Sequence, residues 1–342
     1  MTARLRPLVA APLAALLLTG SSAVARAADA IVIDFVRHGE AGAHTVIDNS
    51  VPGPVLTPAG WGQAHQVVDL LDGHGIDAIF TSGMTRAQET AEPLARMLDL
   101  VVPAGLPGLN EIDAGIFADL PVKTGGLPIG AVAYAAVPFL WTLGLYGVPQ
   151  PGTALNGMVF QDQFGSAVQS LYEASVAGGD DHVAVFGHQA SIAMWALMNA
   201  DNPDYLLMAR LALTTGELLP YGGVVEMAGS PTDGWTLVDW AGYPVPPASL
   251  PVELFVDARD LITAPQLAVQ HLWDALGSAD PAVVTAALGA GADQVGTALW
   301  QFPFAVGGDL IDAALNPAET LTGLGGLSGE AVAVLAAVLS LL

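Results

Sequence analysis

Cysteine is absent from the 342 residues of the chain. This absence excludes a disulfide framework, thiolate catalysis and zinc sites that use cysteine. It does not fix the cellular compartment, because large secreted domains can fold without disulfides. The length and the apolar composition, which is rich in Ala, Gly and Pro, favour a core domain of about 200 residues with an appendage.

Positive charge is scarce, with nine Lys or Arg against 33 Asp or Glu. Residues 1–27 combine two early arginines, an apolar centre and a small-x-small motif at Ala25 and Ala27, and these features predict a secretory signal peptide. The alternative is an uncleaved amino-terminal anchor. We therefore expect the protein to be secreted or held at the cell envelope.

Removal of the signal peptide takes away three arginines and no acid, so six cationic side chains remain against 33 acidic ones, a net charge of about −27. A field of this sign repels nucleic acid and anionic membrane surfaces, which argues against nucleic-acid partners. The scarcity also makes each remaining cation informative. The six are Arg37, Arg86, Arg96, Lys123, Arg210 and Arg259.

Charge of either sign is missing from residues 124–161, which are rich in Gly, Pro and large apolar side chains. The stretch has the length of a membrane span, but Pro128, Pro138 and Pro149 interrupt any continuous helix. We therefore expect an apolar, lid-like insertion that covers the functional site. A segment that dips into a membrane interface is the alternative.

The composition changes again after residue 243, where four prolines between residues 244 and 251 form a linker-like run. Ala-rich amphipathic segments follow and predict a helical extension over residues 252–342. Its uncharged end, residues 331–342, is too short to span a bilayer and long enough to pack on the body or on a partner.

Two apolar segments end in a histidine. Residues 31–36 run into Arg37 and His38, which predicts a buried strand that places an imidazole at its carboxyl end, where open α/β sheets bind ligands. Residues 182–186 repeat the pattern and end in Gly187 and His188. Because the local context recurs, we expect both histidines to reach one pocket. His182, at the other end of its strand, is expected to face solvent, and His65 and His74 to lie on the surface or in packing.

A cation and two carboxylates are further candidates for this pocket. Thr85 and Gln88 have capping-box spacing, which places Arg86 in the first turn of a helix, where free backbone amides favour an anion. Glu111 and Asp113 lie in an otherwise apolar loop, and partial desolvation of either carboxyl would suit a general acid.

Four motifs, taken in chain order, resemble those of the histidine phosphatase superfamily, whose fold is phosphoglycerate-mutase-like. The resemblance covers about Ala30 to Asp239. It implies a histidine phosphatase domain over residues 28–243, built as an α/β three-layer sandwich with a mostly parallel sheet and helices on both faces, before the helical extension. The motifs are Arg37-His38-Gly39-Glu40, Leu56-Thr57-Pro58-Ala59-Gly60 with Gln63-Ala64, Ser82 through Arg86-Ala87 to Thr90-Ala91, and Gly187-His188.

The resemblance also implies roles for particular residues. His38 would be the nucleophile that becomes phosphorylated, and its second ring nitrogen should be fixed by a hydrogen bond, for instance to a backbone carbonyl. Glu111 would donate the proton to the leaving oxygen, with Asp113 as its competitor. No metal and no other cofactor is implied. The residues implied to hold the phosphoryl oxygens are Arg37, His38, Arg86 and His188.

The sequence departs from the family pattern at Ala41, where Thr or Ser is common, and His44 is a further candidate for the pocket. We expect a phosphomonoesterase whose substrate is a phosphorylated small molecule with an apolar part. One alternative is a weakly active or non-catalytic member that serves as an interaction module of the cell envelope. A phosphotransferase of the mutase type is the other.

Overall fold

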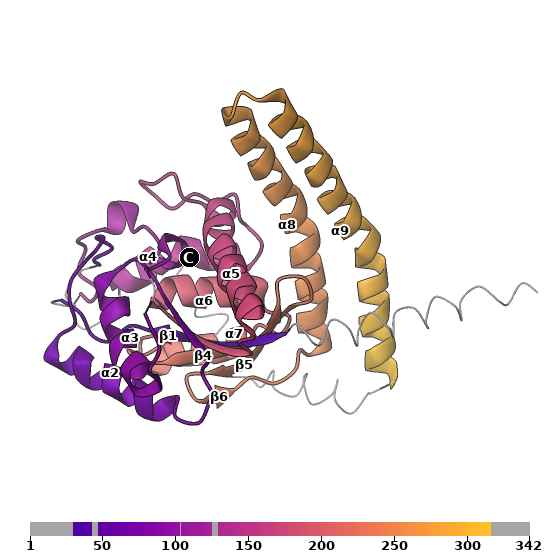
Figure 1. The fold of residues 1–342 in the computed structure, drawn as a ribbon. Helices are drawn as coiled ribbons and strands as arrows, with labels where there is room; N and C mark the ends of the chain where they lie inside the picture. Colours follow the sequence, from indigo (N-terminus) through magenta and orange to yellow (C-terminus); the bar gives the residue numbers. More distant parts are fainter. Residues whose placement is uncertain (1–29, 43–46, 103, 125–128, 316–342) are drawn as a thin grey trace, which may run out of the picture.

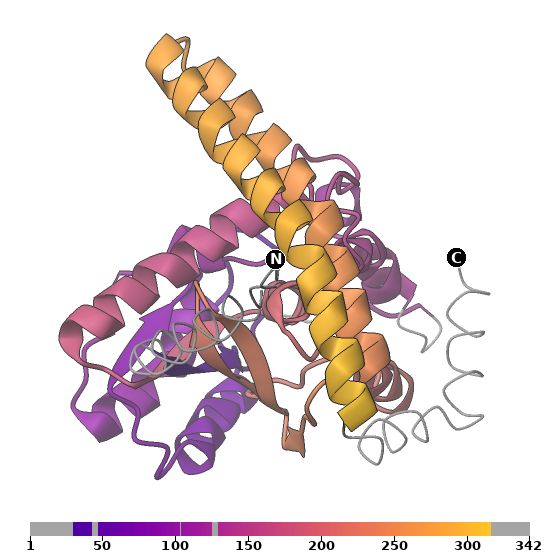
Figure 2. The same cartoon turned by 90° about the vertical axis from the view of Figure 1, so that its right-hand side faces the viewer.

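The computed structural model describes residues 30–42, 47–102, 104–124 and 129–315. The predicted signal peptide, His44 and the uncharged carboxyl-terminal end lie outside these residues. Within them, helices cover both faces of a central sheet, and a long helical hairpin extends beyond this body (Figures 1 and 2). The predicted α/β fold with a carboxyl-terminal helical extension is confirmed.

The sheet is mixed, and fewer of its neighbouring strands are parallel than the sequence suggested. Its order is β2-β3-β1-β4-β5-β6, in which β2, β3 and β1 pair in parallel and the remaining pairs are antiparallel. Part of the difference arises because β4 and β5 are joined by a short turn, which allows only antiparallel pairing. The strands are β1 (Ile31–Arg37), β2 (Ala78–Thr81), β3 (His182–Gly187), β4 (Val224–Ser230), β5 (Gly234–Trp240) and β6 (Tyr243–Pro244).

Strand β1 lies inside the sheet, between β3 and β4, and its side chains alternate between two packed layers. Ile33 and Phe35 belong to a core shared with α5 (Gly157–Gly178) and α6 (Gln189–Asn199). Val36 belongs to the opposite core, shared with α2 (Pro58–Leu70) and α3 (Thr85–Leu98). This burial on both faces explains why the strand reads as an apolar run and not as an alternating pattern.

The starts of α2 and α3 differ in one detail from the sequence prediction. Thr57 caps α2 as expected, because its hydroxyl accepts the Gly60 N–H at 3.1 Å. Thr85, by contrast, is the first residue of α3 and not its cap; the cap position belongs to Met84, whose side chain makes no capping bond. Arg86 nevertheless lies in the first turn, where the sequence placed it.

The uncharged residues 124–161 contribute much of their apolar surface to the core. They include α4 (Ile129–Thr142), and the loop after it leads into α5. Trp141 is fully buried and stacks on Phe160, with ring centroids 5.6 Å apart, while Tyr134 and Tyr146 are also buried. The absence of charge therefore reflects, in good part, packing against α6 and α5.

The extension consists of α8 (Leu250–Gly277) and α9 (Pro281–Leu315), which run side by side as a hairpin (Figures 1 and 2). The Ala-rich segments that the sequence predicted are parts of these two long helices, because α8 continues through Pro265 and α9 through Pro303. Helix α8 is fastened to the body by Arg259, which donates to the carbonyls of Leu197 and Ala200. In the part of the chain that the structure describes, no helix is both long and apolar enough to cross a membrane.

The remaining elements connect these layers. The segment between α3 and α4 contains two short 3-10 turns, and α7 lies between α6 and β4. Their bounds are Pro107–Leu109, Gly115–Phe117 and, for α7, Tyr205–Thr214.

Candidate active site

The two strand-end histidines lie side by side. Strands β1 and β3 pair in parallel with Arg37 opposite Gly187, so His38 and His188 emerge together at their carboxyl ends. The His38 amide donates to the Gly187 carbonyl at 3.0 Å, and the centroids of the two imidazole rings are 5.0 Å apart. The parallel register therefore brings the two histidines together, as the sequence predicted.

The contacts of His38 select one tautomer of its ring. Nδ1 lies 2.6 Å from the Gly39 carbonyl oxygen, which can only accept a hydrogen bond, so Nδ1 carries the hydrogen. Nε2 accepts a hydrogen bond from Nε of Arg86 at 3.1 Å. This arrangement leaves the lone pair of the neutral imidazole on Nε2, directed at a permanent cation. The backbone carbonyl that the sequence analysis expected is therefore present.

His188 is fully buried and electrically neutral in this setting. Burial, reinforced by the positive charges of Arg86 and Arg37, holds the pKa of His188 well below its usual range. Its Nε2 lies 2.8 Å from Oγ of Ser82, which also accepts the Met84 amide. If Ser82 donates its own hydrogen to Nε2, the remaining hydrogen of His188 lies on Nδ1, where it can bind an anion.

Three polar atoms around His38 are buried and have no hydrogen-bond partner: Nε of Arg37, an Nη atom of Arg86 and Nδ1 of His188. Buried donors without partners are rare in folded proteins because each costs free energy. Burial also lowers the pKa of Arg86, although the nearby Glu111 carboxylate opposes this effect. The pocket thus carries donors that an anion with several oxygens would satisfy.

The guanidinium of Arg37 is held by residues that the sequence did not indicate as site residues. Its guanidinium lies 3.7 Å from the ring centroid of Tyr221, and its Nη1 donates to Glu217 at 3.0 Å and to the Leu219 carbonyl. The Tyr221 ring is also 5.8 Å from that of His38. The only sequence signal for Tyr221 was its position before two glycines and a strand, which is too general to identify a site residue.

Glu111 and Asp113 lie in different environments. The Glu111 carboxylate accepts the amides of Ser191 at 2.8 Å and Ala190 at 3.2 Å, in the first turn of α6 directly after His188. A helix start suits a negative group because its free N–H groups point outwards. Asp113 is exposed and accepts the Gly115 amide within its own turn. Geometry therefore favours Glu111 as the pocket carboxyl.

The second motif of the sequence supports the loop that carries His38. A side chain at Gly60 would place its Cβ 2.0 Å from the carbonyl oxygen of Glu40, so only glycine fits against this loop. The Gly39 amide donates to Thr90 and the Glu40 amide to Gln63. Residues from α2 and α3 thus hold the backbone directly after His38 in one position.

Other histidines do not belong to this pocket. His65 is exposed, in agreement with the expectation of a surface residue. His182 was expected to face solvent, but this is wrong: its side chain is 17% exposed and bonds to Asp34 in the middle of β1. His74 bonds to the same carboxylate. The three residues form a separate cluster, far along β1 from His38.

The structure thus combines a mixed α/β sheet with two strand-end histidines and two buried arginines. A family model described as "Histidine phosphatase superfamily (branch 1)" matches residues 33–218, more than half of the chain. The chain therefore belongs to the histidine phosphatase superfamily. The match ends before β4, so it includes neither α8 nor α9.

Two proteins are similar to the chain in sequence. The chain is 47% identical over 300 residues to "PE-PGRS family protein PE_PGRS11" of Mycobacterium tuberculosis, covering 84% of this chain and 49% of that protein. It thus spans about half the length of this relative. "Uncharacterized protein Rv0525" of the same organism is 31% identical over 166 residues, which cover 48% of this chain and 75% of that protein.

A solved structure with a similar fold is that of mycobacterial glucosyl-3-phosphoglycerate phosphatase, complexed with VO3. The sequence identity is 18% and the TM-score 0.44, with 62% of this chain and 98% of that chain covered.

Proposed function

We propose that the protein is a phosphomonoesterase that works through a phosphohistidine on His38. The observation that carries this proposal is the contact of Nε2 of His38 with Arg86, together with buried side-chain nitrogens of Arg37, Arg86 and His188 that have no hydrogen-bond partner. The equatorial oxygens of a phosphoryl group in transfer require such fixed donors, and arginine presents them in a fork. The neutral imidazole is the form that can attack phosphorus.

In the first step, the Nε2 lone pair of His38 forms a bond to phosphorus while the ester P–O bond breaks. The leaving oxygen takes a proton from the Glu111 carboxyl. In the second step, a water oxygen attacks phosphorus, Glu111 accepts the proton of that water, and the P–N bond returns its electrons to Nε2. Arg86 would exchange its bond to Nε2 for a phosphoryl oxygen when substrate enters.

The test is a panel of phosphate esters assayed with the purified protein and with His38→Ala. We expect the variant to lose activity by at least about a thousandfold and to trap no phosphoenzyme after acid quenching, because His38 supplies the nucleophile in this mechanism. His65→Ala, which removes an exposed histidine of α2, is the matched control and should behave as the unaltered protein. Turnover retained in His38→Ala would contradict the mechanism.

The role of Glu111 has its own matched pair, Glu111→Gln and Asp113→Asn. Loss of a general acid slows poor leaving groups by about 10²- to 10⁴-fold and has less effect on nitrophenyl phosphate, whose oxygen needs little protonation. We expect this selectivity only in Glu111→Gln. If Asp113→Asn shows it instead, the proton donor is Asp113.

For the substrate, we propose a phosphorylated small molecule with an apolar part. Helix α4 supports this, because Tyr134 of α4 donates to the Ile112 carbonyl beside Glu111, and the same helix exposes Ile129 and Val132. Turnover of alkyl and aryl phosphates should exceed that of sugar phosphates of similar size. A clear preference for small sugar phosphates would contradict this choice.

A second role, interaction at the cell envelope, is favoured by one observation. The hairpin of α8 and α9 exposes large apolar side chains, including Trp273, Trp300 and Phe304. Exposed apolar patches of this kind often mark binding surfaces. Export is part of this proposal and rests on residues 1–27, so identification of the amino-terminal residue of protein recovered outside the cell tests it.

A further inference from the structure

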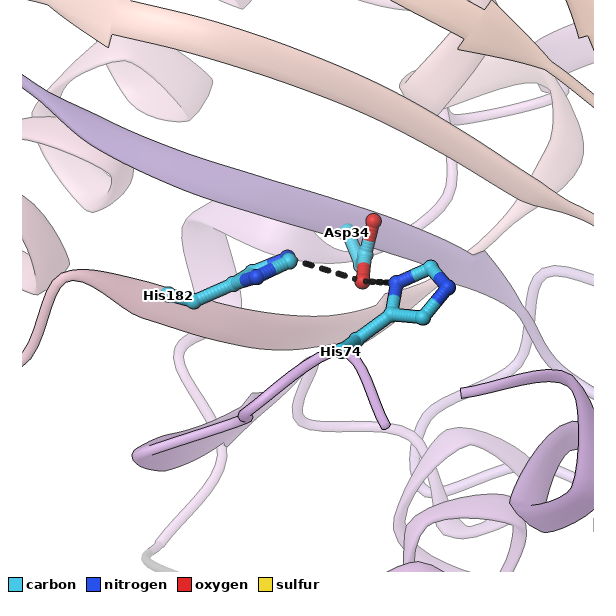
Figure 3. Close-up of side chains that lie close together, drawn as sticks. All are labelled: Asp34, His74 and His182. Carbon is cyan, nitrogen blue, oxygen red and sulfur yellow. Dashed lines mark hydrogen bonds and ion pairs between the residues drawn. The ribbon is translucent and has the colours of Figure 1, made fainter. Parts of the chain in front are cut away.

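A cluster of three side chains lies in the body away from the phosphate pocket. Asp34 is in β1, His182 is the first residue of β3, and His74 follows α2, so three separate elements meet there (Figure 3). Oδ2 of Asp34 is 3.0 Å from Nδ1 of His74 and 3.0 Å from Nε2 of His182. Within the described ranges, this is the only group of three such side chains whose ligand atoms all lie within 4.8 Å of one another.

We propose that Asp34, His74 and His182 bind a divalent transition-metal ion of the zinc class. Two imidazoles and one carboxylate are a common ligand set for Zn²⁺, with a fourth position left for water. Ligand atoms at about 2.0–2.1 Å from a tetrahedral ion lie roughly 3.4 Å apart, so the two distances of 3.0 Å need only a small expansion. Imidazole ligands favour Zn²⁺, Co²⁺ or Ni²⁺ over Ca²⁺ and Mg²⁺.

A second observation separates this site from an ordinary ion pair. Asp34 is 0% exposed, and both histidines bond to the same oxygen, Oδ2. The other oxygen, Oδ1, is buried and has no hydrogen-bond partner. An unpaired buried carboxylate oxygen is costly, whereas a cation beside the carboxylate would compensate both of its oxygens.

The cluster can be reached from outside. A groove of about 560 Å³ is lined by His74 and by Glu226, and it extends to Tyr221. Glu226 is opposite Asp34 in the pairing of β1 with β4, so its side chain lies on the same face of the sheet. This second carboxylate adds negative charge at the entrance and would attract a cation, or hold a water on it.

The site is distinct from the phosphate pocket. Asp34 precedes Arg37 by three residues, which is about 10 Å along the strand. A bound ion would join β1, β3 and the end of α2 by bonds that the sheet itself does not provide. The ion would therefore stabilise the fold and would not be a reactant, whereas the family resemblance in the sequence implied no metal.

The experiment is a calorimetric titration of the chelator-treated chain, residues 28–342, with ZnCl2 and with CoCl2. We expect one ion per chain, and affinity reduced by at least about a hundredfold in His74→Gln and in His182→Gln, because each removes one of three ligands. Two exposed histidines supply the controls, His65→Gln and His271→Gln, which should retain the affinity. His38→Ala should also retain it, which excludes binding at the phosphate pocket.

A thermal-unfolding series provides the second readout and checks that the variants fold. Saturating Zn²⁺ should raise the Tm of the unaltered chain by several degrees, as expected for a ligand that binds only the folded state, and should not raise that of His74→Gln. Co²⁺ bound by the cluster should give the intense visible absorption of a tetrahedral site. Absence of binding tighter than about 100 µM, a free energy near −5.5 kcal/mol, would overturn the proposal. Binding that is unaffected by both histidine substitutions would overturn it as well.

Discussion

The body and the hairpin of α8 and α9 differ in the exposure of their tryptophan side chains. In the body, Trp141 and Trp240 are completely buried, and Trp195 nearly so. In the hairpin, Trp273 and Trp300 are each 71% exposed. Both regions are apolar in sequence, so composition alone does not decide burial. A side chain is buried only where a second layer covers it.

The layers account for this contrast. The body has a sheet with helices on both faces, so its apolar faces are covered from two directions. Helix α9 packs chiefly on α8, and none of its residues is buried. The body therefore has a core of its own, whereas α9 packs mainly on α8 alone and leaves apolar side chains such as Leu299 and Phe304 in contact with solvent.

The largest change in stability is expected for Trp141→Ala, which tests the buried side of this contrast. Removing a buried tryptophan should lower the free energy of unfolding by about 3–5 kcal/mol. The indole's contacts with Phe160 and the neighbouring core are lost, and a cavity remains in their place. Denaturant unfolding of the body measures the change. A loss below about 1 kcal/mol would mean that the uncharged stretch is not part of the core.

Attachment of the hairpin should depend on Arg259. This buried side chain of α8 donates to the carbonyls of Leu197 and Ala200 at the end of α6, which lack helical partners there. Arg259→Leu should cost about 2–3 kcal/mol, since charge-assisted bonds are lost and two acceptors remain buried. The readouts are the Tm and the rate of proteolysis within α8. The exposed Arg210→Leu is the matched control, and equal effects of the two substitutions would contradict this attachment.

The stability of the hairpin should depend on pH, because Asp257 of α8 lies beside Asp309 of α9. Burial, together with the nearby carboxylate of Asp309 and a hydrogen bond to it, raises the pKa of Asp257 to about 6. A raised pKa in the folded state stabilises the protein at low pH, and that stabilisation is lost as the pH rises through 6. Asp257→Asn should therefore raise the Tm at pH 8 and have little effect at pH 4. An equal shift at both values would show that Asp257 is not protonated in this range.

The smallest effect is expected for Trp300→Ala. Its indole is exposed, so removing it should change the free energy of unfolding by no more than about 0.5 kcal/mol. Measured beside Trp141→Ala, the same chemical change then gives two values that differ several-fold. A large loss for Trp300→Ala would mean that the hairpin face is covered, for instance by another copy of the chain, which a sedimentation experiment would detect.

Much of the body could be predicted from local sequence. The apolar runs that become β1 and β3, and Thr57 before α2, carry their signals within a few residues. Helix α4 was missed as a core element because an uncharged run with prolines is equally typical of a lid. The lengths of α8 and α9 were missed because Pro265 and Pro303 suggest breaks, whereas long helices tolerate them where packing on a neighbour continues.

The proposed phosphate site was easier to predict than the cluster of Asp34, His74 and His182. Each of its main residues stands in a short motif that is recognisable in the local sequence. The structure brings these residues together, namely His38, Arg86 and His188. Asp34 and His182 are 148 residues apart, and only the pairing of β1 with β3 brings them together. Such a relation depends on strand register, which local sequence does not specify.

The placement of the few arginines has a consequence for the rate at which substrate arrives. Three of the six cations that follow residue 27 are buried, so only Arg96, Lys123 and Arg210 are left to offset the acidic exterior. Under the proposed function, a phosphorylated substrate approaches through this repulsive field before it meets the donors around His38. Because salt screens such repulsion, kcat/KM for a dianionic ester should increase with ionic strength, opposite to the behaviour of electrostatically steered enzymes.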